Sequence, residues 1–204
     1  MTTAQLNESV KAGEGESLEV HPLALIELLE GASTHASKDK SLYALNTVQL
    51  LGEEGKLIAR ATDRYRLIEG KIEGEGGQLS PSLIALNDIK RVIAIAKEGK
   101  VSGKVSITRI ADLLTVSING SAITLTLLDA NYPNTFEDLF AKGEVSAIET
   151  IAFNPAFFAD YAKIVGKGVQ VSVTFKGERM PMVIGLVGDK VNWKALLMPM
   201  RFSK

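Results

Sequence analysis

The apolar positions of this chain follow one pattern three times, and each copy spans roughly 60 residues. In each copy a short alternating run, typical of a strand, precedes a run with apolar residues at helical spacing, and three alternating runs follow. The copies occupy residues 17–73, 78–139 and 145–202. The pattern predicts three βαβββ units and an α+β fold in which helices pack on one face of antiparallel sheets.

Each predicted helix begins at a residue suited to a helix N-terminus, namely Pro22, Asn87 and the Asn154-Pro155 pair. The apolar helix faces are Leu25, Ile26, Leu28 and Leu29 in the first copy, Ile89, Val92, Ile93 and Ala96 in the second, and Phe157, Phe158, Tyr161, Ile164 and Val165 in the third. The strands are expected at residues 18–20, 42–51, 57–62 and 65–72, then at 82–86, 105–110, 113–118 and 123–128, and finally at 149–153, 169–175, 182–187 and 191–198.

Two segments outside the copies are expected to be flexible. Residues 1–16 are rich in Gly, Glu, Ser and Thr without periodicity, which predicts an N-terminal arm. The run Glu73-Gly74-Glu75-Gly76-Gly77 predicts a joint between the first two copies. The expected organisation is therefore an arm at 1–16, a domain at 17–140 made of two halves (17–73 and 78–139), and a half-domain at 141–204.

The composition narrows the classes of function. Hydrophobic residues make up 46% of the chain and aromatic residues 6%, so a core is expected and it must be mostly aliphatic. A net charge of −1 and a pI of about 6.2 argue against a basic surface that binds nucleic acid everywhere, although a basic stripe on one face is compatible with them. With no Cys and two His, neither disulfides nor a zinc site is expected.

Catalytic motifs are also missing from the sequence. No phosphate-binding Gly-x-x-x-x-Gly-Lys-Ser/Thr loop is present, and Asp63 has no second carboxylate or His beside it. His21 precedes a helix proline and His35 lies in a polar loop. We therefore expect a protein that is not an enzyme and needs no cofactor, with a small α+β enzyme as the alternative from another class. No apolar run is long enough to span a membrane, which favours a soluble cytoplasmic protein.

Two segments carry a specific resemblance: Ala61-Thr62-Asp63-Arg64-Tyr65-Arg66-Leu67 and Met198-Pro199-Met200-Arg201-Phe202. Three shorter landmarks accompany them in order, namely Leu42-Tyr43-Ala44-Leu45-Asn46, Asn131-Tyr132-Pro133 and Phe153-Asn154-Pro155. Together they resemble the bacterial DNA polymerase III β sliding clamp family. The first two copies resemble both halves of that family's middle domain, and the third resembles the second half of its last domain. The resemblance implies a DNA-clamp fold in a reduced, phage-type form.

The resemblance implies a pocket that binds a short peptide of a partner protein. The residues that match its lining are Leu45, Thr62, Tyr65, Leu67, Pro133, Met198, Pro199, Met200, Arg201 and Phe202. Methionine side chains suit varied apolar ligands. The chain departs from the family at Arg64 and Thr47, where the family usually has Gly. The plainer interpretation is that these are ordinary strand residues.

The resemblance also implies that positively charged helix faces contact duplex DNA. The matching residues are Lys90, Arg91, Lys97, Lys100, Lys163 and Lys167. Such contacts would go to phosphates, without sequence specificity and with a strong salt dependence. A solvated helix face is the alternative, and Glu27 and Glu30 on the first helix favour it.

The resemblance thus implies a processivity factor that binds duplex DNA, DNA polymerase and other proteins with a clamp-binding motif, with a clamp loader as a further candidate partner. The alternative is a clamp-derived regulator that keeps the pocket and does not encircle DNA. A homo-oligomer is expected. Four chains would supply twelve units for a ring with two-fold axes across it, and a two-fold dimer and a monomer remain open.

Overall fold

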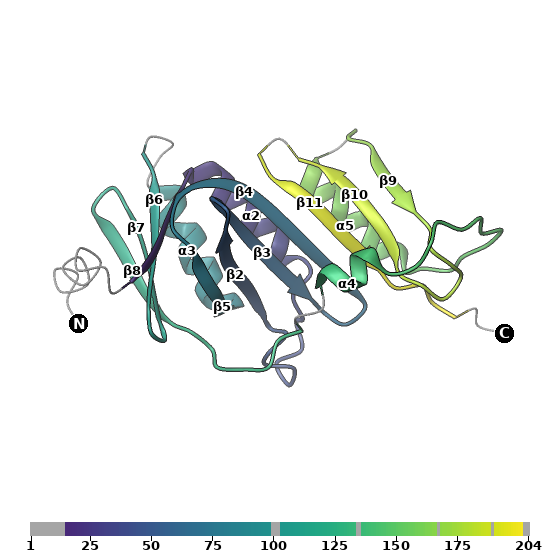
Figure 1. Ribbon diagram of the computed structural model, residues 1–204, viewed down its shortest axis with the longest axis horizontal. Helices are drawn as coiled ribbons and strands as arrows, with labels where there is room; N and C mark the ends of the chain where they lie inside the picture. The colour runs from purple at the N-terminus through teal and green to yellow at the C-terminus, as the bar shows by residue number, and fades with distance from the viewer. Residues whose placement is uncertain (1–14, 99–102, 134–135, 167, 189, 202–204) are drawn as a thin grey trace.

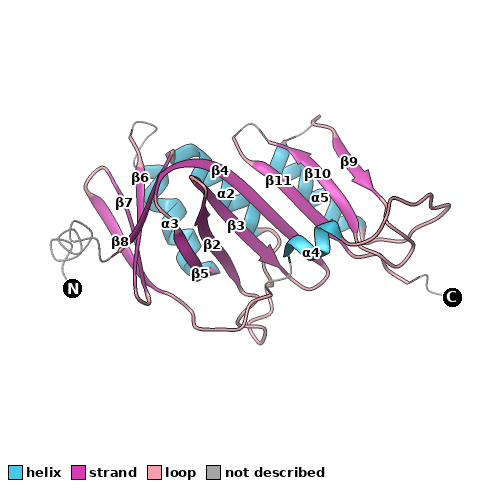
Figure 2. Cartoon of the chain, viewed as in Figure 1, coloured by secondary structure: helices cyan, strands magenta, loops and turns pink. Residues whose placement is uncertain are grey.

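The computed structural model describes residues 15–98, 103–133, 136–166, 168–188 and 190–201. Its strands form one connected sheet, and three helices cover a single face of it (Figures 1 and 2). These helices are α2 (Pro22–Ser33), α3 (Leu86–Glu98) and α5 (Pro155–Val165). The arrangement confirms the predicted α+β class with helices packed on antiparallel strands.

The elements follow the predicted repeat, and we refer to the three copies as units 1, 2 and 3. Unit 1 contains β1 (Glu16–Val20), α2, β2 (Thr47–Glu53), β3 (Lys56–Thr62) and β4 (Arg66–Gly76). Unit 2 contains β5 (Leu79–Ala85), α3, β6 (Val105–Ile110), β7 (Leu113–Ile118) and β8 (Ser121–Thr126). Unit 3 contains residues 149–153, α5, β9 (Val171–Thr174), β10 (Met182–Val187) and β11 (Asn192–Leu197).

Units 1 and 2 exchange their first strands. β1 pairs with β6 of unit 2, with Leu18 opposite Ile107, whereas β5 pairs with β2 of unit 1, with Val48 opposite Ile84. α2 packs against α3 on the same side of the sheet. The two units therefore bury one shared aliphatic core, as the composition predicts.

Strand β4 of unit 1 has strand partners along both of its edges. β3 pairs with β4 along one edge. On the other edge, β11 pairs with residues 66–71 of β4, and β1 pairs with residues 74–76. Backbone hydrogen bonds therefore connect unit 3 to unit 1, although residues 77–191 separate β4 from β11 in the sequence.

A tryptophan packs where unit 3 meets unit 1. Trp193 of β11 is buried, and its indole lies against Gly31 of α2 and Gly70 of β4. A Cβ built on Gly31 would lie 2.5 Å from the ring. Close contact at this junction therefore depends on two positions that have no side chain.

The prediction of a strand at residues 42–51 is wrong in its first half. The Leu45 N–H donates to the Leu42 carbonyl (2.8 Å), and the Asn46 side-chain amide donates to the Ser37 carbonyl (2.6 Å). Residues 42–46 therefore form turns that close on the end of α2, and β2 begins at Thr47.

The predicted flexible joint at residues 73–77 is also wrong, because β4 continues to Gly76 and pairs there with β1. A Cβ on Gly76, whose φ is 131°, would lie 2.7 Å from the Ser17 carbonyl oxygen. Glycine here allows two strands to approach closely, and in a sequence this looks the same as a linker. At the other end of unit 1, β1 already begins at Glu16, the last residue assigned to the arm.

Two further differences concern unit 3 and the segment before it. The strand expected at 149–153 is reduced to a single bridge between Ala152 and Met200. The first strands of units 1 and 2 each pair with the other unit, β1 with β6 and β5 with β2, and unit 3 has no such neighbouring unit in the described part of the chain. The short helix α4 (Phe136–Ala141) was not expected; it lies on the sheet face opposite the other helices (Figure 1).

No helix in the described ranges is long and apolar enough to cross a membrane.

Candidate functional site

The junction of β4 and β11 brings the two motif segments together. Leu67 lies opposite Leu196 in this antiparallel pair. Just beyond it, the Met198 N–H donates to the Tyr65 carbonyl (2.8 Å). Segments more than a hundred residues apart in the sequence are therefore held edge to edge by backbone hydrogen bonds.

The loop before β4 has a fixed shape that presents Tyr65 to solvent. The Thr62 hydroxyl donates to the Arg66 carbonyl (2.7 Å), and the Asp63 carboxylate accepts from the N–H groups of Tyr65 (3.1 Å) and Arg66 (3.0 Å). Asp63 thus closes a turn, as its isolation in the sequence predicts. Arg64 has a φ of 78°, a left-handed conformation that favours glycine, and Tyr65 is 61% exposed.

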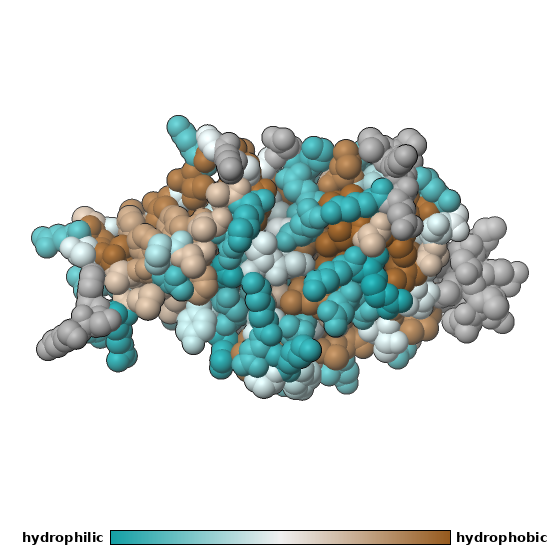
Figure 3. Space-filling view, turned by 180° about the vertical axis from the view of Figure 1, so that it is seen from behind, coloured by the Kyte–Doolittle hydropathy of each residue, from teal (hydrophilic) through white to brown (hydrophobic). Residues whose placement is uncertain are grey.

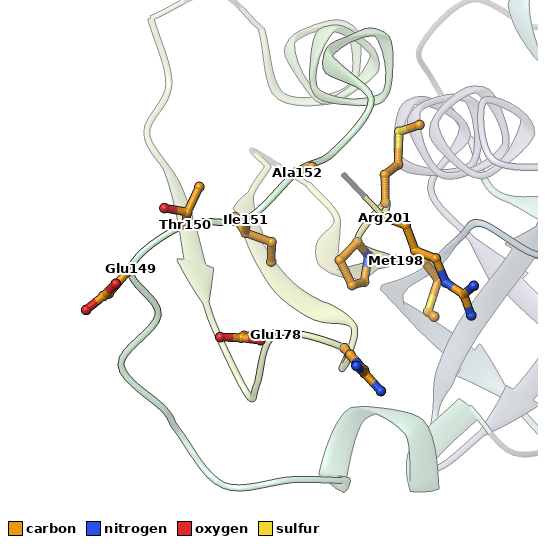
Figure 4. Close-up of a pocket in the computed structure, with 10 residues that line it drawn as sticks. Glu149, Thr150, Ile151, Ala152, Glu178, Met198 and Arg201 are labelled. Carbon is orange, nitrogen blue, oxygen red and sulfur yellow. The ribbon is translucent and has the colours of Figure 1, made fainter. Parts of the chain in front are cut away.

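Two hollows meet at Met198, which lines both of them. The smaller one, about 80 Å³, is lined by Thr62, Arg64, Tyr65, Arg66, Leu67, Leu139, Pro181, Leu196 and Met198. The larger one, about 610 Å³, is lined by Glu149, Thr150, Ile151, Ala152, Glu178, Arg179, Met198, Pro199, Met200 and Arg201. In Figure 4 Glu149 and Thr150 lie on one side of the larger hollow, and Met198 and Arg201 lie on the opposite side. We call the two hollows together the groove.

The floor of the smaller hollow is a separate apolar cluster on the sheet face away from α2. Leu67, Leu196 and Phe136 are buried in it, with Tyr132 and Leu139 packed around them. The rings of Tyr132 and Phe136 stack with centroids 6.0 Å apart. The Asn131-Tyr132-Pro133 landmark therefore leads into α4, and α4 covers the β4–β11 junction.

Behind the groove, Arg66 connects unit 1 to unit 3. Its guanidinium donates to Asp63 (2.9 Å), to Asp160 of α5 (2.6 Å) and to the Thr34 carbonyl (2.8 Å). The guanidinium also lies over the Phe157 ring, 4.5 Å from its centroid. Burial raises the pKa of Asp160, but hydrogen bonds from Lys163 and Arg66 outweigh it and hold that pKa below its usual value.

The prediction that His35 lies in a polar loop is wrong about the surroundings of its side chain. His35 is completely buried, its Nδ1 lies 2.7 Å from the Thr34 hydroxyl, and its ring packs on Tyr161. Burial, together with the charge of Arg66, lowers the pKa of His35 to about 3. His35 is thus a neutral core residue between α2 and α5. Among the described residues, no cluster of His, Asp or Glu is arranged to hold a metal ion.

The structure places most of the predicted pocket residues around the groove. Thr62, Tyr65 and Leu67 line the smaller hollow, Pro199, Met200 and Arg201 line the larger one, and Met198 lines both. Leu45 and Pro133 line neither, and Phe202 lies outside the described residues. The sequence did not indicate Ile151, Ala152, Arg179, Pro181, Leu139 or Leu196. For Leu196 the signal was present, because it belongs to the strand that leads into the Met198 motif.

Four of the predicted DNA-contacting residues lie in the described ranges; all four are exposed on the helix side, and three of them pair with carboxylates. Lys97 contacts Glu30, Arg91 contacts Asp88, and Lys163 contacts Asp160. Lys90 is exposed and has no ion-pair partner within the described ranges. Lys100 and Lys167 lie outside the described residues. Because α2 lies between α3 and α5, the helices share one face without α3 and α5 being neighbours (Figure 1).

Comparisons with known proteins agree with this geometry. Residues 19–134 match the family model of the DNA polymerase III beta subunit, central domain. A comparison with curated protein sequences gives no match.

Solved structures with a similar fold include three clamps. The DNA polymerase III beta subunit of Thermotoga maritima has a TM-score of 0.78 at 19% identity, over 92% of this chain and 66% of that one. The sliding clamp of Pseudomonas aeruginosa bound to griselimycin has a TM-score of 0.77 at 14% identity, over 91% and 65%. The sliding clamp of Bacillus subtilis has a TM-score of 0.74 at 17% identity, over 92% and 64%.

At these identities the likeness concerns the fold, and the chain spans slightly less than two thirds of the length of these clamps. The family match covers more than half of the residues, from within β1 of unit 1 to beyond β8 of unit 2. The chain therefore belongs to the DNA polymerase III beta subunit family.

Proposed function

We propose that this protein is a sliding-clamp-like processivity factor that recruits DNA polymerase and other replication proteins through the groove. The observation that carries the proposal is the pairing of the two motif segments across the β4–β11 junction, where Met198 lines both hollows. Tyr65 (61%), Met200 (56%) and Met198 (40%) are among the most exposed large apolar side chains of the described residues. Apolar anchors around a hollow favour binding of an extended peptide.

Peptide binding tests the groove directly. A synthetic peptide carrying the apolar clamp-binding residues of the cognate polymerase should bind at about micromolar strength, roughly −8 kcal/mol. Met200→Ala should weaken binding by about 1–2 kcal/mol, because it removes one anchor from a small site. Val187→Ala is the matched control, since Val187 is 75% exposed and lies outside the groove. Equal affinity of folded Met200→Ala and parent protein would refute the groove as the peptide site.

The proposal includes duplex DNA as a partner that contacts the helix face. Replacing Lys90 and Lys97 by Glu should weaken association with DNA and reduce its salt dependence, because each phosphate contact contributes about one unit of slope. Lys194→Glu is the control, since Lys194 is exposed on β11 and follows the inward-facing Trp193, so it points away from the helices. An unchanged slope in the double variant would remove these residues from the proposal.

One observation favours a second function, a regulator that keeps the groove and does not encircle DNA. The sequences of the three helices contain five carboxylates and four cations, so the helices carry no excess of positive charge; these residues are Glu27, Glu30, Asp88, Glu98 and Asp160, and Lys90, Arg91, Lys97 and Lys163. Hydrophilic side chains lie across the helix face beside apolar ones in Figure 3. Retention on nicked circular DNA with release on linearisation would support the clamp. Peptide binding without such retention would support the regulator.

A further inference from the structure

Units 1 and 2 show how two units of this chain complete each other. In unit 1, β1 lies between β4 of its own unit and β6 of unit 2. On the β6 side, Val20 is opposite Val105 and Leu18 is opposite Ile107. All four side chains are at most 2% exposed. The contact between units thus consists of an exchanged strand above a pair of packed helices.

Unit 3 repeats the sequence features of this contact. Val171-Ser172-Val173-Thr174 of β9 matches Val105-Ser106-Ile107-Thr108 of β6 almost residue for residue. Phe153-Asn154-Pro155 precedes α5 as Val20-His21-Pro22 precedes α2, and in both helices the cap residue accepts a backbone hydrogen bond. By this alignment, Ile151 and Phe153 take the places of Leu18 and Val20.

The strand-forming segment of unit 3 is already held along its inner edge. Ala152 aligns with Glu19, which pairs with Glu75 near the end of β4. Ala152 forms a bridge with Met200, just beyond the end of β11, and accepts a 2.8 Å hydrogen bond from its N–H. The segment therefore lies on β11 as β1 lies on β4, and its outer edge has no strand within the described ranges.

The same side chains that are buried between units 1 and 2 are uncovered in unit 3. Phe153 is 37% exposed, and Ile151, Val171 and Val173 are half-buried. On α5, Phe158 and Val165 are half-buried where Leu25 and Ala32 of α2 are completely buried. In Figure 3 the end of the molecule that carries α5, on the left, is mainly tan and brown. Uncovered apolar surface of this kind indicates an interface.

We propose that unit 3 pairs with unit 3 of a second copy of this chain about a two-fold axis. The segment 150–153 of one copy becomes a strand antiparallel to β9 of the other, and the two α5 helices pack together as α2 and α3 do. Unit 3 supplies both the segment that adds as a strand (150–153) and the free edge of β9 that receives such a strand. A self-complementary interface requires both on the same surface. Residues 142–154, which join α4 to α5, are too few to form another unit between them. This inference does not depend on the proposed function.

The register follows from the β1–β6 pair. Glu19 lies opposite Ser106, so Ala152 of one copy lies opposite Ser172 of the other. Their side chains point away from the core, and both residues are small. Thr174, two residues further along β9, is displaced by about 7 Å, too far for a disulfide with position 152.

Because the chain has no Cys, single-cysteine variants can test this contact. Ala152→Cys and Ser172→Cys proteins of different tag length are mixed and mildly oxidised. We expect a mixed disulfide-linked dimer from this pair, and little from Ala152→Cys with Thr174→Cys or from either variant alone. Equal linking in all mixtures, or none in the matched mixture, would overturn the proposal.

The mass in solution gives a second measurement on the unmodified chain. Sedimentation equilibrium should show at least two chains per particle, and Val173→Glu should shift the mass towards one chain. Val187→Glu, at an exposed position of β10 outside the contact, should leave the mass unchanged. A parent protein that stays monomeric at all concentrations would show that something other than a second copy covers unit 3, and would overturn the proposal.

Discussion

Gly70→Ala should loosen the attachment of unit 3 to unit 1. A Cβ at this position would lie 2.6 Å from Cε3 of Trp193 and 2.7 Å from Cδ1 of Leu28. Carbon atoms normally approach to about 3.5–4 Å, so the indole must move by about 1 Å. Gly31 on its other side and complete burial around it leave little room for that movement.

The expected cost follows from overpacking of a tight core site. Extra carbon in a close-packed core typically costs about 1–3 kcal/mol of folding free energy. Replacing a strand glycine by alanine otherwise stabilises by about 0.5–1 kcal/mol, which offsets part of this cost. We therefore expect a net loss of about 1–2 kcal/mol in the free energy of unfolding.

Urea unfolding followed by tryptophan fluorescence measures this effect where it occurs. Trp193 is the only tryptophan of the chain, so its emission reports on this junction alone. Gly70→Ala should shift the tryptophan emission to longer wavelength and lower the urea concentration at the midpoint of unfolding. Far-UV circular dichroism gives the loss in the free energy of unfolding for the whole fold. Gly77→Ala is the control, because its Cβ would lie 3.7 Å from the nearest atom, an ordinary contact. A Gly70→Ala protein with the emission and midpoint of the parent would refute the reasoning.

Three further predictions concern the loop and the core behind it. Arg64→Gly should change the free energy of unfolding, measured in urea, by less than about 1 kcal/mol. Glycine relieves the strain of the left-handed backbone (φ of 78°), but it also gives the unfolded chain more conformational freedom, and the two effects offset each other. A larger loss of stability would contradict this reasoning. The low pKa of His35, about 3, means that only the unfolded chain takes up its proton below about pH 6.5. Stability should therefore fall by about 1.4 kcal/mol per pH unit between pH 6 and 4.5, and His35→Gln should flatten this part of a stability–pH curve. Arg66→Met leaves the carboxylates of Asp63 and Asp160 without their partner and should cost about 3 kcal/mol in thermal unfolding, whereas a loss below about 1 kcal/mol would show that the ion pairs contribute little.

Much of the fold could be predicted because local signals agreed with the repeat. Pro22 and the Asn154-Pro155 pair placed the starts of α2 and α5, and the apolar helix faces placed the side of each helix that packs on the sheet. The errors occurred where one local signal fits two structures. Glycines at 74 and 76 suit a linker and also a close strand contact, and the apolar residues at 42–45 suit a strand and also a packed turn.

For the groove, the sequence supplied the two motifs and the structure supplied their surroundings. Tyr65 and Met198 could be predicted because each belongs to a contiguous motif. Leu139 and Pro181 could not, since they reach the groove only through the packing of α4 and the start of β10 against the β4–β11 junction. The same limit applies to the charges on the helices. The carboxylate that pairs with Lys97 is Glu30 of another helix, and no spacing rule connects them, whereas Lys163 and Asp160 are three residues apart on α5, a spacing that the sequence shows.

The position of β4 in the sheet also has a consequence for synthesis of the chain on the ribosome. β4 emerges long before β11, the strand that covers residues 66–71 of its free edge. Adding residues 77–191 takes roughly 6–23 s at about 5–20 residues per second. During that interval the edge presents unpaired backbone groups beside Leu67 and Ile68, which makes it a template for another nascent chain. Residues 66–71 of β4, which border the groove, are therefore the part of unit 1 whose backbone stays unpaired longest during translation.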